Sequence, residues 1–506
     1  MQYLLKWLTR IFAVIYSLSI FPSDAESLAS SQNLKSGFSQ SHNLNQQTRI
    51  SLLSDDNFRT KIQSFNRERI PGRRSFGTGN GAFGFFETTS EQIGSLSKAK
   101  IFEKIGKRCK IVTRLSSGPA RVDKPQVVGN DAAGFSIRFF TTEGNWDLLT
   151  MTTPVSSFRD PSRTFEGIHA LEERPLNNQA YPDQIKDMNT ILPEGFHSLM
   201  WQYSDVGLHK NWRVLTGFSI CAFKLVNSEG EYVNVRFSIK AKKKYDYLTL
   251  DEANWFRGYV PDYYARDLYA AIDRGDFPEF SLRIQIVEPK DEDNFDFFLF
   301  DPTKMWDERR FPWITIGRIV LNENPKNWFS EIESLALNPM NLIPGIETAF
   351  DRVTQSRLFI YSDTHRFRLG TNHQLLPINK PLNLPKPIHP DAGFCTKSSD
   401  QQNFNGNLLY SESQKSGPTQ GSRPFQIPGG TLIRRHDVSY LDNYSQPNQT
   451  WMSFGRGQQE RLVERLSLDL LASRPETRIR FLKHAKILNP DWCHKLALAI
   501  GLDDRC

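Results

Sequence analysis

Three segments of the chain, 135–139, 233–239 and 280–286, alternate apolar and polar residues with a period of two. Successive side chains of a β-strand point to opposite faces, so this pattern predicts half-buried antiparallel strands. Several such strands within roughly 200 residues, with helical insertions between them, are typical of a β-barrel or sandwich. The pattern therefore predicts a fold of the α+β class.

The pattern changes on both sides of this strand-rich region. Residues 26–57 and 381–457 are rich in Ser, Asn, Gln or Pro and show little periodicity, which indicates an extended or mobile arm and a long wrapping connection. Apolar residues return with helical spacing near the C-terminal end. They lie on two faces, formed by Leu462, Leu466 and Leu470 and by Ile479, Leu482 and Ala485. We therefore predict an ordered core over 58–380 and a helical region over 458–506.

The first 25 residues have the features of a secretory signal. Lys6 and Arg10 precede the apolar run 11–21, and Ser23-Asp-Ala25 offers small residues for cleavage. The run is too short to span a bilayer. We therefore expect removal of residues 1–25, a secreted or secretory-pathway protein, and no stable membrane insertion afterwards. An uncleaved membrane anchor is the alternative.

Other features of the sequence agree with export or limit the possible partners. The sequons Asn443-Tyr-Ser445 and Asn448-Gln-Thr450 suit a secreted chain, and the sequence ends at Cys506 without a peroxisomal Ser-Lys-Leu tail. The five cysteines are too few and too scattered for a disulfide scaffold, and their spacing fixes no pairing. The net charge of +7 is spread along the chain, so nucleic-acid binding is not expected.

Candidate chemistry is densest in the segment 357–370. Arg357 and Tyr361 are four residues apart, which places them on one face of a helix, where the positive charge favours the ionised phenol. A tyrosinate is one of the few side chains that ligate the iron of haem. The alternative is an amphipathic helix whose Tyr361 packs in a core.

This segment resembles the proximal haem motif of the catalase family. The resemblance implies that Tyr361 is the axial iron ligand, that Arg357 pairs with it, and that Arg368 binds a haem propionate, with His365 also at the cofactor. A histidine that links this pair to an aspartate in the family is Cys221 here. The resemblance further implies haem b, an antiparallel eight-stranded β-barrel, a homotetramer, and a peroxide or small hydroperoxide as the substrate.

A glycine-rich segment, 79–84, has the spacing GxGxxG, which also occurs in dinucleotide-binding proteins. Here a Pro-Gly-Arg-Arg loop precedes it and an aromatic strand follows, whereas the dinucleotide motif needs a strand before it and a helix after it. The segment instead resembles the distal haem motif of catalases, in which Arg73 would contact the cofactor. The family's catalytic histidine is Phe76 in this chain, and a phenyl ring cannot exchange a proton.

Two further segments resemble the distal side of the same family. Arg114 and Ser116 match its propionate-binding arginine and its distal serine. Met151 replaces the asparagine that orients peroxide, and methionine has no donor. Positions that carry channel-narrowing aromatic residues in the family are small here, namely Ser156, Thr164 and Gly167. These departures predict a wider or wetter approach, unless backbone shifts refill it.

Residues that hold NADPH in many members of the family are only partly matched. His197, Ser204 and Lys240 are present, but an expected arginine is Val206 and an expected histidine is Glu308. We therefore do not expect this chain to bind NADPH.

These features predict a haem oxidoreductase of peroxide metabolism, acting on hydrogen peroxide or an organic hydroperoxide, whose dismutation activity is weak. Ser75, or a water held by Ser116, is the alternative proton relay, although hydroxyls are poor bases at neutral pH. The rival hypothesis is a catalytically inactive secreted protein that binds haem or has a structural role.

Overall fold

The computed structural model describes residues 55–118, 125–127, 129–130, 132–179, 181, 183–349, 351–383 and 441–506. The predicted signal peptide, nearly all of the predicted arm, and residues 384–440 of the predicted connection lie outside this part of the chain. The chain divides into two compact units, Met1–Arg69 and Ile70–Cys506. In the first unit, helix α2 spans Asp56–Asn66, and the side chain of Asp55 caps its N-terminus.

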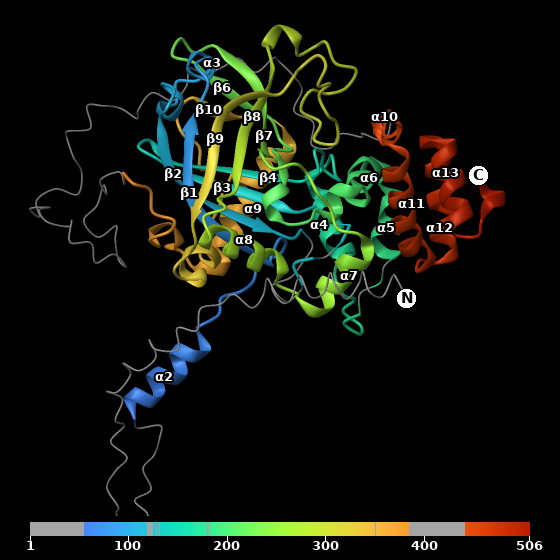
Figure 1. Cartoon of the computed structure of the whole chain (residues 1–506), viewed down its shortest axis with the longest axis horizontal. Coiled ribbons are helices and arrows are strands. Elements are labelled where there is room, and N and C mark those ends of the chain that lie inside the picture. The colour runs from blue at the N-terminus through green and yellow to red at the C-terminus, as the bar shows by residue number, and fades with distance from the viewer. Residues whose placement is uncertain are drawn as a thin grey trace, which may run out of the picture. The chain divides into compact units, whose positions relative to one another are not determined.

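The second unit is built on an antiparallel β-sheet that closes on itself (Figure 1). Its strands are β1 (Gly79–Thr88), β2 (Arg108–Ser116), β3 (Gly134–Thr141), β4 (Gly144–Met151), β5 (Thr216–Phe218), β6 (Phe223–Val226), β7 (Tyr232–Ala241), β8 (Glu279–Val287), β9 (Ile314–Glu323) and β10 (Ile346–Thr348). Neighbours follow the order β10-β6-β7-β5-β4-β3-β2-β1-β9-β8, and β7 also pairs with β8. That pairing closes β1–β5 and β7–β9 into an eight-stranded barrel. The predicted α+β barrel is confirmed, and the three predicted strands lie within β3, β7 and β8.

The barrel closes around large aromatic side chains. Phe86, Phe139, Trp146 and Phe237 are fully buried. Their rings form a chain of contacts with centroid distances of 5.4, 4.3 and 5.5 Å. Each aromatic pair at such a distance contributes about 0.5–1.5 kcal/mol beyond the area that it buries.

Strand β1 runs directly through the glycine-rich segment 79–84. Gly84 lies where the register between β1 and β9 shifts, and a Cβ at this position would lie 1.9 Å from the carbonyl oxygen of Val320. Only glycine permits this approach of the two strands. Because a strand occupies the segment, the GxGxxG spacing is not a dinucleotide-binding motif, as predicted.

Helices pack outside the barrel and form a separate cluster at the C-terminal end (Figure 1). In the second unit they are α3 (Gln92–Leu96), α4 (Pro161–Ala170), α5 (Asp183–Ile191), α6 (Phe196–Tyr203), α7 (Leu250–Tyr259), α8 (Tyr263–Asp273), α9 (Arg352–Leu369), α10 (Ser445–Ser453), α11 (Arg456–Leu471), α12 (Pro475–Leu488) and α13 (Pro490–Ala499). Helices α6 and α10–α13 share a second hydrophobic core. The predicted helical faces are confirmed, since all their residues but the half-buried Ile479 are buried. No helix in the described ranges is long and apolar enough to cross a bilayer.

Candidate functional site

Helix α9 carries most of the residues predicted to hold the cofactor. Asp351 begins the helix, because its carboxylate accepts hydrogen bonds from the Thr354 amide at 2.7 Å and from the Thr354 hydroxyl at 2.6 Å. Arg357, Tyr361 and His365 follow at four-residue intervals within α9. The three side chains therefore share one face of the helix.

Arg357 lies between Tyr361 and Cys221. Its guanidinium carbon is 5.7 Å from the centre of the Tyr361 ring, and its Nη1 donates a hydrogen bond to Cys221 Sγ at 3.4 Å. Burial alone would lower the pKa of Arg357, but Cys221 and Tyr361 raise it above its ordinary value. Arg357 thus contacts the predicted ligand on one side and a thiol on the other.

Of the three arginines predicted to contact the cofactor, Arg73 and Arg368 bind one carboxylate, and Arg114 lies within its electrostatic reach. Arg73 Nη1 and Arg368 Nη1 donate to the two carboxylate oxygens of Glu333 at 2.5 and 3.2 Å. Both guanidiniums also donate to main-chain carbonyls of the segment 332–335. Arg114 Nη2 donates to the carbonyl oxygen of Gly77 at 2.8 Å. The charges of Arg73, Glu333 and Arg368 also act on it electrostatically.

This cluster carries more positive charge than its own carboxylate neutralises. Arg114, Arg368 and Glu333 are buried, and within the described residues the Nε atoms of both arginines have no hydrogen-bond partner. Burial, with repulsion from Arg73 next in importance, lowers the pKa of Arg114 well below its ordinary value. One carboxylate balances one of the three guanidiniums, so two positive charges remain. A haem has two negatively charged propionates, which would balance them. The residues present therefore fit a haem.

His365 contributes no charge to this cluster. Its Nε2 lies 2.8 Å from the carbonyl oxygen of Leu337. Because a carbonyl can only accept, Nε2 carries the proton. Burial lowers the pKa of His365 to about 3, so the imidazole is neutral at physiological pH.

The predicted distal residues meet around Gly134. In the β2–β3–β4 ladder, Gly134 lies opposite Ser116 on one side and opposite Met151 on the other. A Cβ on Gly134 would lie 2.8 Å from Ser116 Oγ and 3.1 Å from Cδ1 of the Phe76 ring. The structure therefore brings Phe76, Ser116 and Met151 together, and of these three only Ser116 has a hydroxyl.

The backbone of Phe76 is unusual for its side chain. Its φ is 57°, in the left-handed region, and its amide donates to the carbonyl oxygen of Gly118 at 2.7 Å. Bulky residues rarely adopt this conformation, whereas Asn, Asp and His are several-fold enriched in it. The loop thus holds a phenyl ring on a backbone that suits a short polar or imidazole side chain.

Small residues occupy the three predicted channel positions, but one of the spaces is filled. A Cβ on Gly167 would lie 2.1 Å from Cζ of Phe158, so the Phe158 ring packs directly over this glycine. Ser156 Oγ accepts a hydrogen bond from the Phe158 amide at 3.1 Å, which fixes the start of this side chain. At Gly167, the Phe158 ring therefore fills the space that the small residue would otherwise add to the substrate channel.

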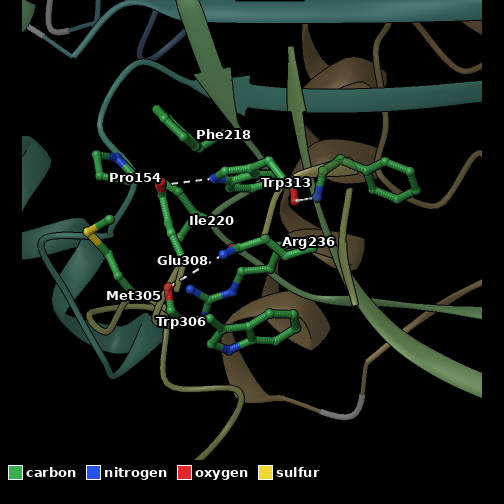
Figure 2. Close-up of a pocket in the computed structure, with 11 residues that line it drawn as sticks. Pro154, Phe218, Ile220, Arg236, Met305, Trp306, Glu308 and Trp313 are labelled. Atoms are coloured by element: carbon green, nitrogen blue, oxygen red, sulfur yellow. Dashed lines mark hydrogen bonds between the residues drawn. The ribbon is translucent and has the colours of Figure 1, made fainter. Parts of the chain in front are cut away.

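The residues considered for NADPH lie on the outside of the barrel. A cavity of about 280 Å³ is lined by Val206, Lys240, Glu308 and Trp313, among others. Figure 2 shows the adjoining pocket, where the Trp313 indole donates to Glu308 at 3.0 Å. The two ring nitrogens of His197 contact oxygens of the protein itself, at 3.2 and 3.0 Å. This arrangement offers a carboxylate, not a cation, at the position of Glu308.

Sequence reasoning does not single out Glu333, on which Arg73 and Arg368 converge. It ends a short irregular helix, Phe329–Glu333, and lies 260 residues from Arg73. A lone acidic residue in such a segment carries no recognisable motif. The available signal was indirect, because three buried cations need at least one anion nearby.

The sequence and the fold of this chain match those of known proteins. The sequence profile of the Catalase family matches residues 31–415. The chain is 33% identical to the catalase of Helicobacter pylori over 471 residues, which cover 89% of this chain and 90% of that protein. It is 40% identical to the catalase of Danio rerio over 330 residues, which cover 65% of this chain and 62% of that protein. Among solved structures, catalase A from Saccharomyces cerevisiae matches with a TM-score of 0.81 and 31% identity, over 89% of this chain and 94% of that chain.

Proposed function

Because this chain belongs to the catalase family, whose members use haem in peroxide metabolism, we propose that it binds haem b through Tyr361 and dismutates hydrogen peroxide only weakly. The contrast between the two sides of the site carries this proposal. On α9, Arg357 faces Tyr361. The cluster of Arg73, Arg114 and Arg368 carries two positive charges that Glu333 does not balance, enough for two carboxylates. Around Gly134, Phe76 replaces the family's proton-exchanging histidine, and Met151 replaces the asparagine that orients peroxide.

On the α9 side, each residue has a defined task. Tyr361 would hold the iron as phenolate, and Arg357 would stabilise its negative charge. Arg73, Arg114 and Arg368 would hold the propionates through charge-assisted hydrogen bonds. A bound haem supplies the redox chemistry of peroxide decomposition, and the protein supplies its binding and orientation.

On the Gly134 side, the chain lacks an efficient proton carrier. The Phe76 ring has no exchangeable proton, and the Met151 thioether is a weak acceptor without a donor. Ser116 has a hydroxyl, but a hydroxyl is a poor base near neutral pH. General acid–base catalysis usually contributes about 10²–10⁴-fold, so we expect dismutation to be weaker by at least this factor than in a relative with the distal histidine and asparagine.

Two forms of this proposal differ in the catalytic activity that they assign to the site. The small side chains at Ser156 and Thr164 favour a larger organic hydroperoxide as the substrate. The simultaneous replacement of both distal polar residues, at Phe76 and Met151, favours the alternative, a catalytically inactive secreted protein that binds haem or has a structural role. Turnover of hydrogen peroxide and of cumene hydroperoxide by the haem-loaded chain separates these forms.

We also propose that the chain is exported. The Cys493–Cys506 disulfide supports an oxidising compartment, which agrees with the signal-like residues 1–25. Secreted material should therefore start after residue 25, and intact Met1 found by N-terminal sequencing would contradict export by cleavage.

Glycosylation at the second sequon is not favoured in the folded chain. Asn448 lies in α10, its side-chain oxygen accepts a hydrogen bond from Asn489 at 2.8 Å, and Thr450 is buried. Intact mass of secreted protein with and without an amidase for N-linked glycans would show whether a glycan is present.

A homotetramer belongs to the same proposal and rests on family membership. Phe359 and Phe367 project from α9 with 68% and 78% of their surface exposed, and contact with another copy would cover such residues. Sedimentation equilibrium of the purified chain tests the assembly.

Reconstitution with haemin tests the haem proposal. The purified chain is mixed with haemin and desalted, and its absorption spectrum is compared with those of Tyr361→Phe and Tyr259→Phe. We expect the wild-type chain and the exposed-tyrosine control to keep a high-spin ferric Soret band, and Tyr361→Phe to lose or shift it. A wild-type chain without a Soret band after desalting would favour the structural alternative.

A further inference from the structure

A fully buried ion pair lies on the wall of the barrel. Arg138 on β3 and Asp147 on β4 are direct cross-strand partners, exposed by 1% and 0%. The pair is bidentate, since Nε and Nη2 of the guanidinium donate to the two carboxylate oxygens at 2.7 Å each. Such geometry fixes the plane of both groups.

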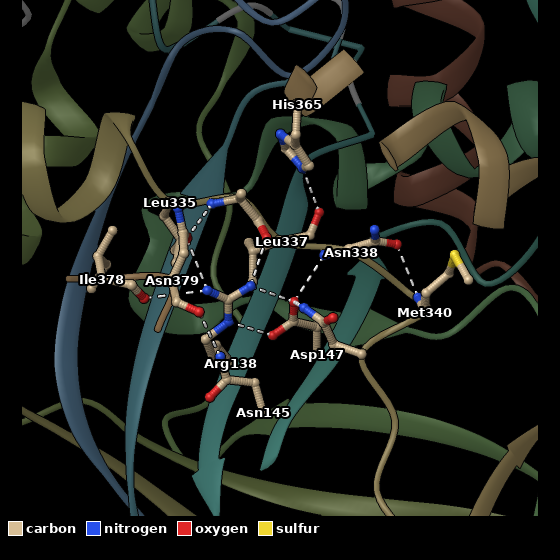
Figure 3. A network of polar contacts seen from close by, with 12 residues as sticks. Arg138, Asn145, Asp147, Leu335, Leu337, Asn338, Met340, His365, Ile378 and Asn379 are labelled. Carbon is tan, nitrogen blue, oxygen red and sulfur yellow. Dashed lines mark hydrogen bonds and ion pairs between the residues drawn. The ribbon is translucent and has the colours of Figure 1, made fainter. Parts of the chain in front are cut away.

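Arg138 also holds chain segments that precede and follow α9 (Figure 3). Its Nη2 donates to the carbonyl oxygen of Ala336 at 2.6 Å, before the helix. Its Nη1 donates to the carbonyl oxygen of Ile378 at 3.2 Å and to the side-chain oxygen of Asn379 at 2.9 Å, after the helix. All five N–H groups of the guanidinium are thus used, three of them on segments that flank α9.

Asp147 also binds the segment 336–341, which precedes α9. One of its carboxylate oxygens also accepts from the Asn338 amide at 2.8 Å and from the Asn341 side chain at 2.7 Å. The Asp147 amide in turn donates to the carbonyl oxygen of Asn341 at 2.9 Å. The segment 336–341 is therefore tied to β3 and β4 at several points.

The same segment contacts α9 beside the predicted ligand. Asn338 donates through Nδ2 to Ser362 Oγ at 3.0 Å, and Ser362 is the residue after Tyr361. Leu337 accepts from His365 Nε2 at 2.8 Å, one turn further along the helix. A continuous set of hydrogen bonds thus runs from the barrel wall to Ser362 and His365, the residues one and four positions after Tyr361.

We propose that the Arg138–Asp147 pair positions Tyr361, by setting the distance and rotation of α9 relative to the barrel. The inference rests on the proposed function of Tyr361 as a haem ligand. Replacing a buried ion pair by apolar residues of similar volume is often neutral or stabilising, so stability alone does not account for this pair. Its hydrogen bonds are directional, and they converge on the segments that flank the ligand.

The decisive variant removes both charges at once. Arg138→Met with Asp147→Leu leaves no unpaired buried charge, so the chain is expected to fold. Its Tm should be lower than that of the wild type, because buried groups such as the Ala336 carbonyl and the Asn338 amide lose their partners. It cannot hold Ala336, Asn338 or Asn379. We expect haemin to dissociate about 10- to 100-fold faster, the range typical for groups that orient metal ligands. The rhombic splitting of the high-spin ferric EPR signal should also change.

A milder variant tests the connection to Tyr361 without touching the pair. Asn338→Leu keeps the amide that bonds to Asp147, and it removes two side-chain bonds, the one to Ser362 Oγ and the one that Asn338 accepts from the Met340 amide at 2.9 Å. We expect an EPR change in the same direction and of smaller size, at unchanged Tm. Asn294→Leu, which removes an exposed side-chain bond to Asp291 outside this network, is the matched control.

The outcomes separate this inference from the proposed function. If the wild-type chain keeps haemin while the double variant and Asn338→Leu match its dissociation rate and EPR signal, the pair does not position Tyr361. If the double variant does not fold, Asn338→Leu decides alone by the same criterion. A wild-type chain that binds no haemin overturns the proposed function, and this inference with it.

Discussion

The ring of Phe76 packs against Gly134, on which a Cβ would lie 3.1 Å from the Phe76 Cδ1 atom. The ring reaches this position from a backbone with φ of 57°, which costs on the order of 1–3 kcal/mol for a bulky residue. Histidine has a ring of similar size and tolerates this region better. We expect Phe76→His to change the free energy of unfolding by less than about 1 kcal/mol, because relieved strain offsets lost apolar contact.

Urea unfolding of the haem-free chain measures this effect. Phe139→His, which places an imidazole in the fully buried barrel core, is the control and should lose more than about 2 kcal/mol. A loss of that size at Phe76 would show that the loop has adapted to the phenyl ring.

The arginine cluster predicts opposite effects of one substitution on stability and on haem binding. Arg114→Met removes one of three mutually repelling buried cations, so the haem-free chain should become more stable, with a higher Tm. The same change removes a partner for a propionate, so haemin affinity should fall about tenfold or more. Arg108→Met, exposed on the same strand, should alter neither property measurably. An unchanged affinity in Arg114→Met would remove this residue from the cofactor site.

Much of the fold could be predicted because its signals are local. The alternation in 135–139, 233–239 and 280–286 marks the long strands, since their apolar side chains fill the barrel core. The expectation that these strands are half-buried is wrong for β3 and β7, where polar side chains such as Arg138, Asn234 and Arg236 are buried as well. The short strands β5 and β10 have only three residues each and carry no readable period. They exist because neighbouring strands offer hydrogen bonds, which is a tertiary effect.

In the candidate site, too, some residues carry a local sequence signal and others depend on tertiary contacts. Tyr361 and Arg357 could be proposed from their spacing on one helix. Glu333 and the Arg138–Asp147 pair act through segments distant in sequence, and no local pattern marks them. The pairing of Cys493 with Cys506 likewise depends on how α13 meets the end of the chain.

Acid should destabilise the chain through its buried histidines, among them His197 and His209. Burial lowers the pKa of His197 and of His209 to about 4, whereas an unfolded histidine titrates near 6.5. Between these values the unfolded chain binds protons that the folded chain does not. The free energy of unfolding should therefore fall as the pH drops from about 6.5 to about 4, by on the order of 1 kcal/mol per histidine and pH unit. Below about pH 4 these histidines are protonated in the folded and the unfolded chain, so they lower the free energy of unfolding no further.

The variant His209→Phe isolates one of these contributions. The phenyl ring can keep the stacking on Tyr264, whose ring centre lies 4.8 Å away, but it cannot titrate. Burial raises the pKa of Glu194 and of Asp351, which acts in the opposite direction, yet these groups are shared by both chains and cancel in the comparison. Urea midpoints at pH 7 and 5 should differ less in His209→Phe. Equal differences in the two chains would contradict the assignment.

The cavity at Val206 and Glu308 should not accept NADPH. Lys240 and Arg283 also line this cavity, but the Glu308 carboxylate repels phosphate groups, and Val206 offers no charge to bind them. Titration of tryptophan fluorescence with NADPH is therefore expected to show no saturable binding to the wild-type chain. Val206→Arg with Glu308→His should raise affinity at least about tenfold, because each charge-assisted hydrogen bond contributes about 1.5–3 kcal/mol. Saturable binding to the wild-type chain would refute the prediction.

Oxygen release from hydrogen peroxide tests the central claim, that a complete proximal side faces a distal side without proton-transfer groups. Haem-loaded wild-type chain is compared with Phe76→His and Met151→Asn combined, and with Tyr361→Phe as the background. We predict that the wild-type chain releases oxygen slowly and that the double replacement is faster by about 10²-fold or more, with Tyr361→Phe remaining inactive. Rapid oxygen release by the unmodified chain, equal to that of the double replacement, would contradict the account.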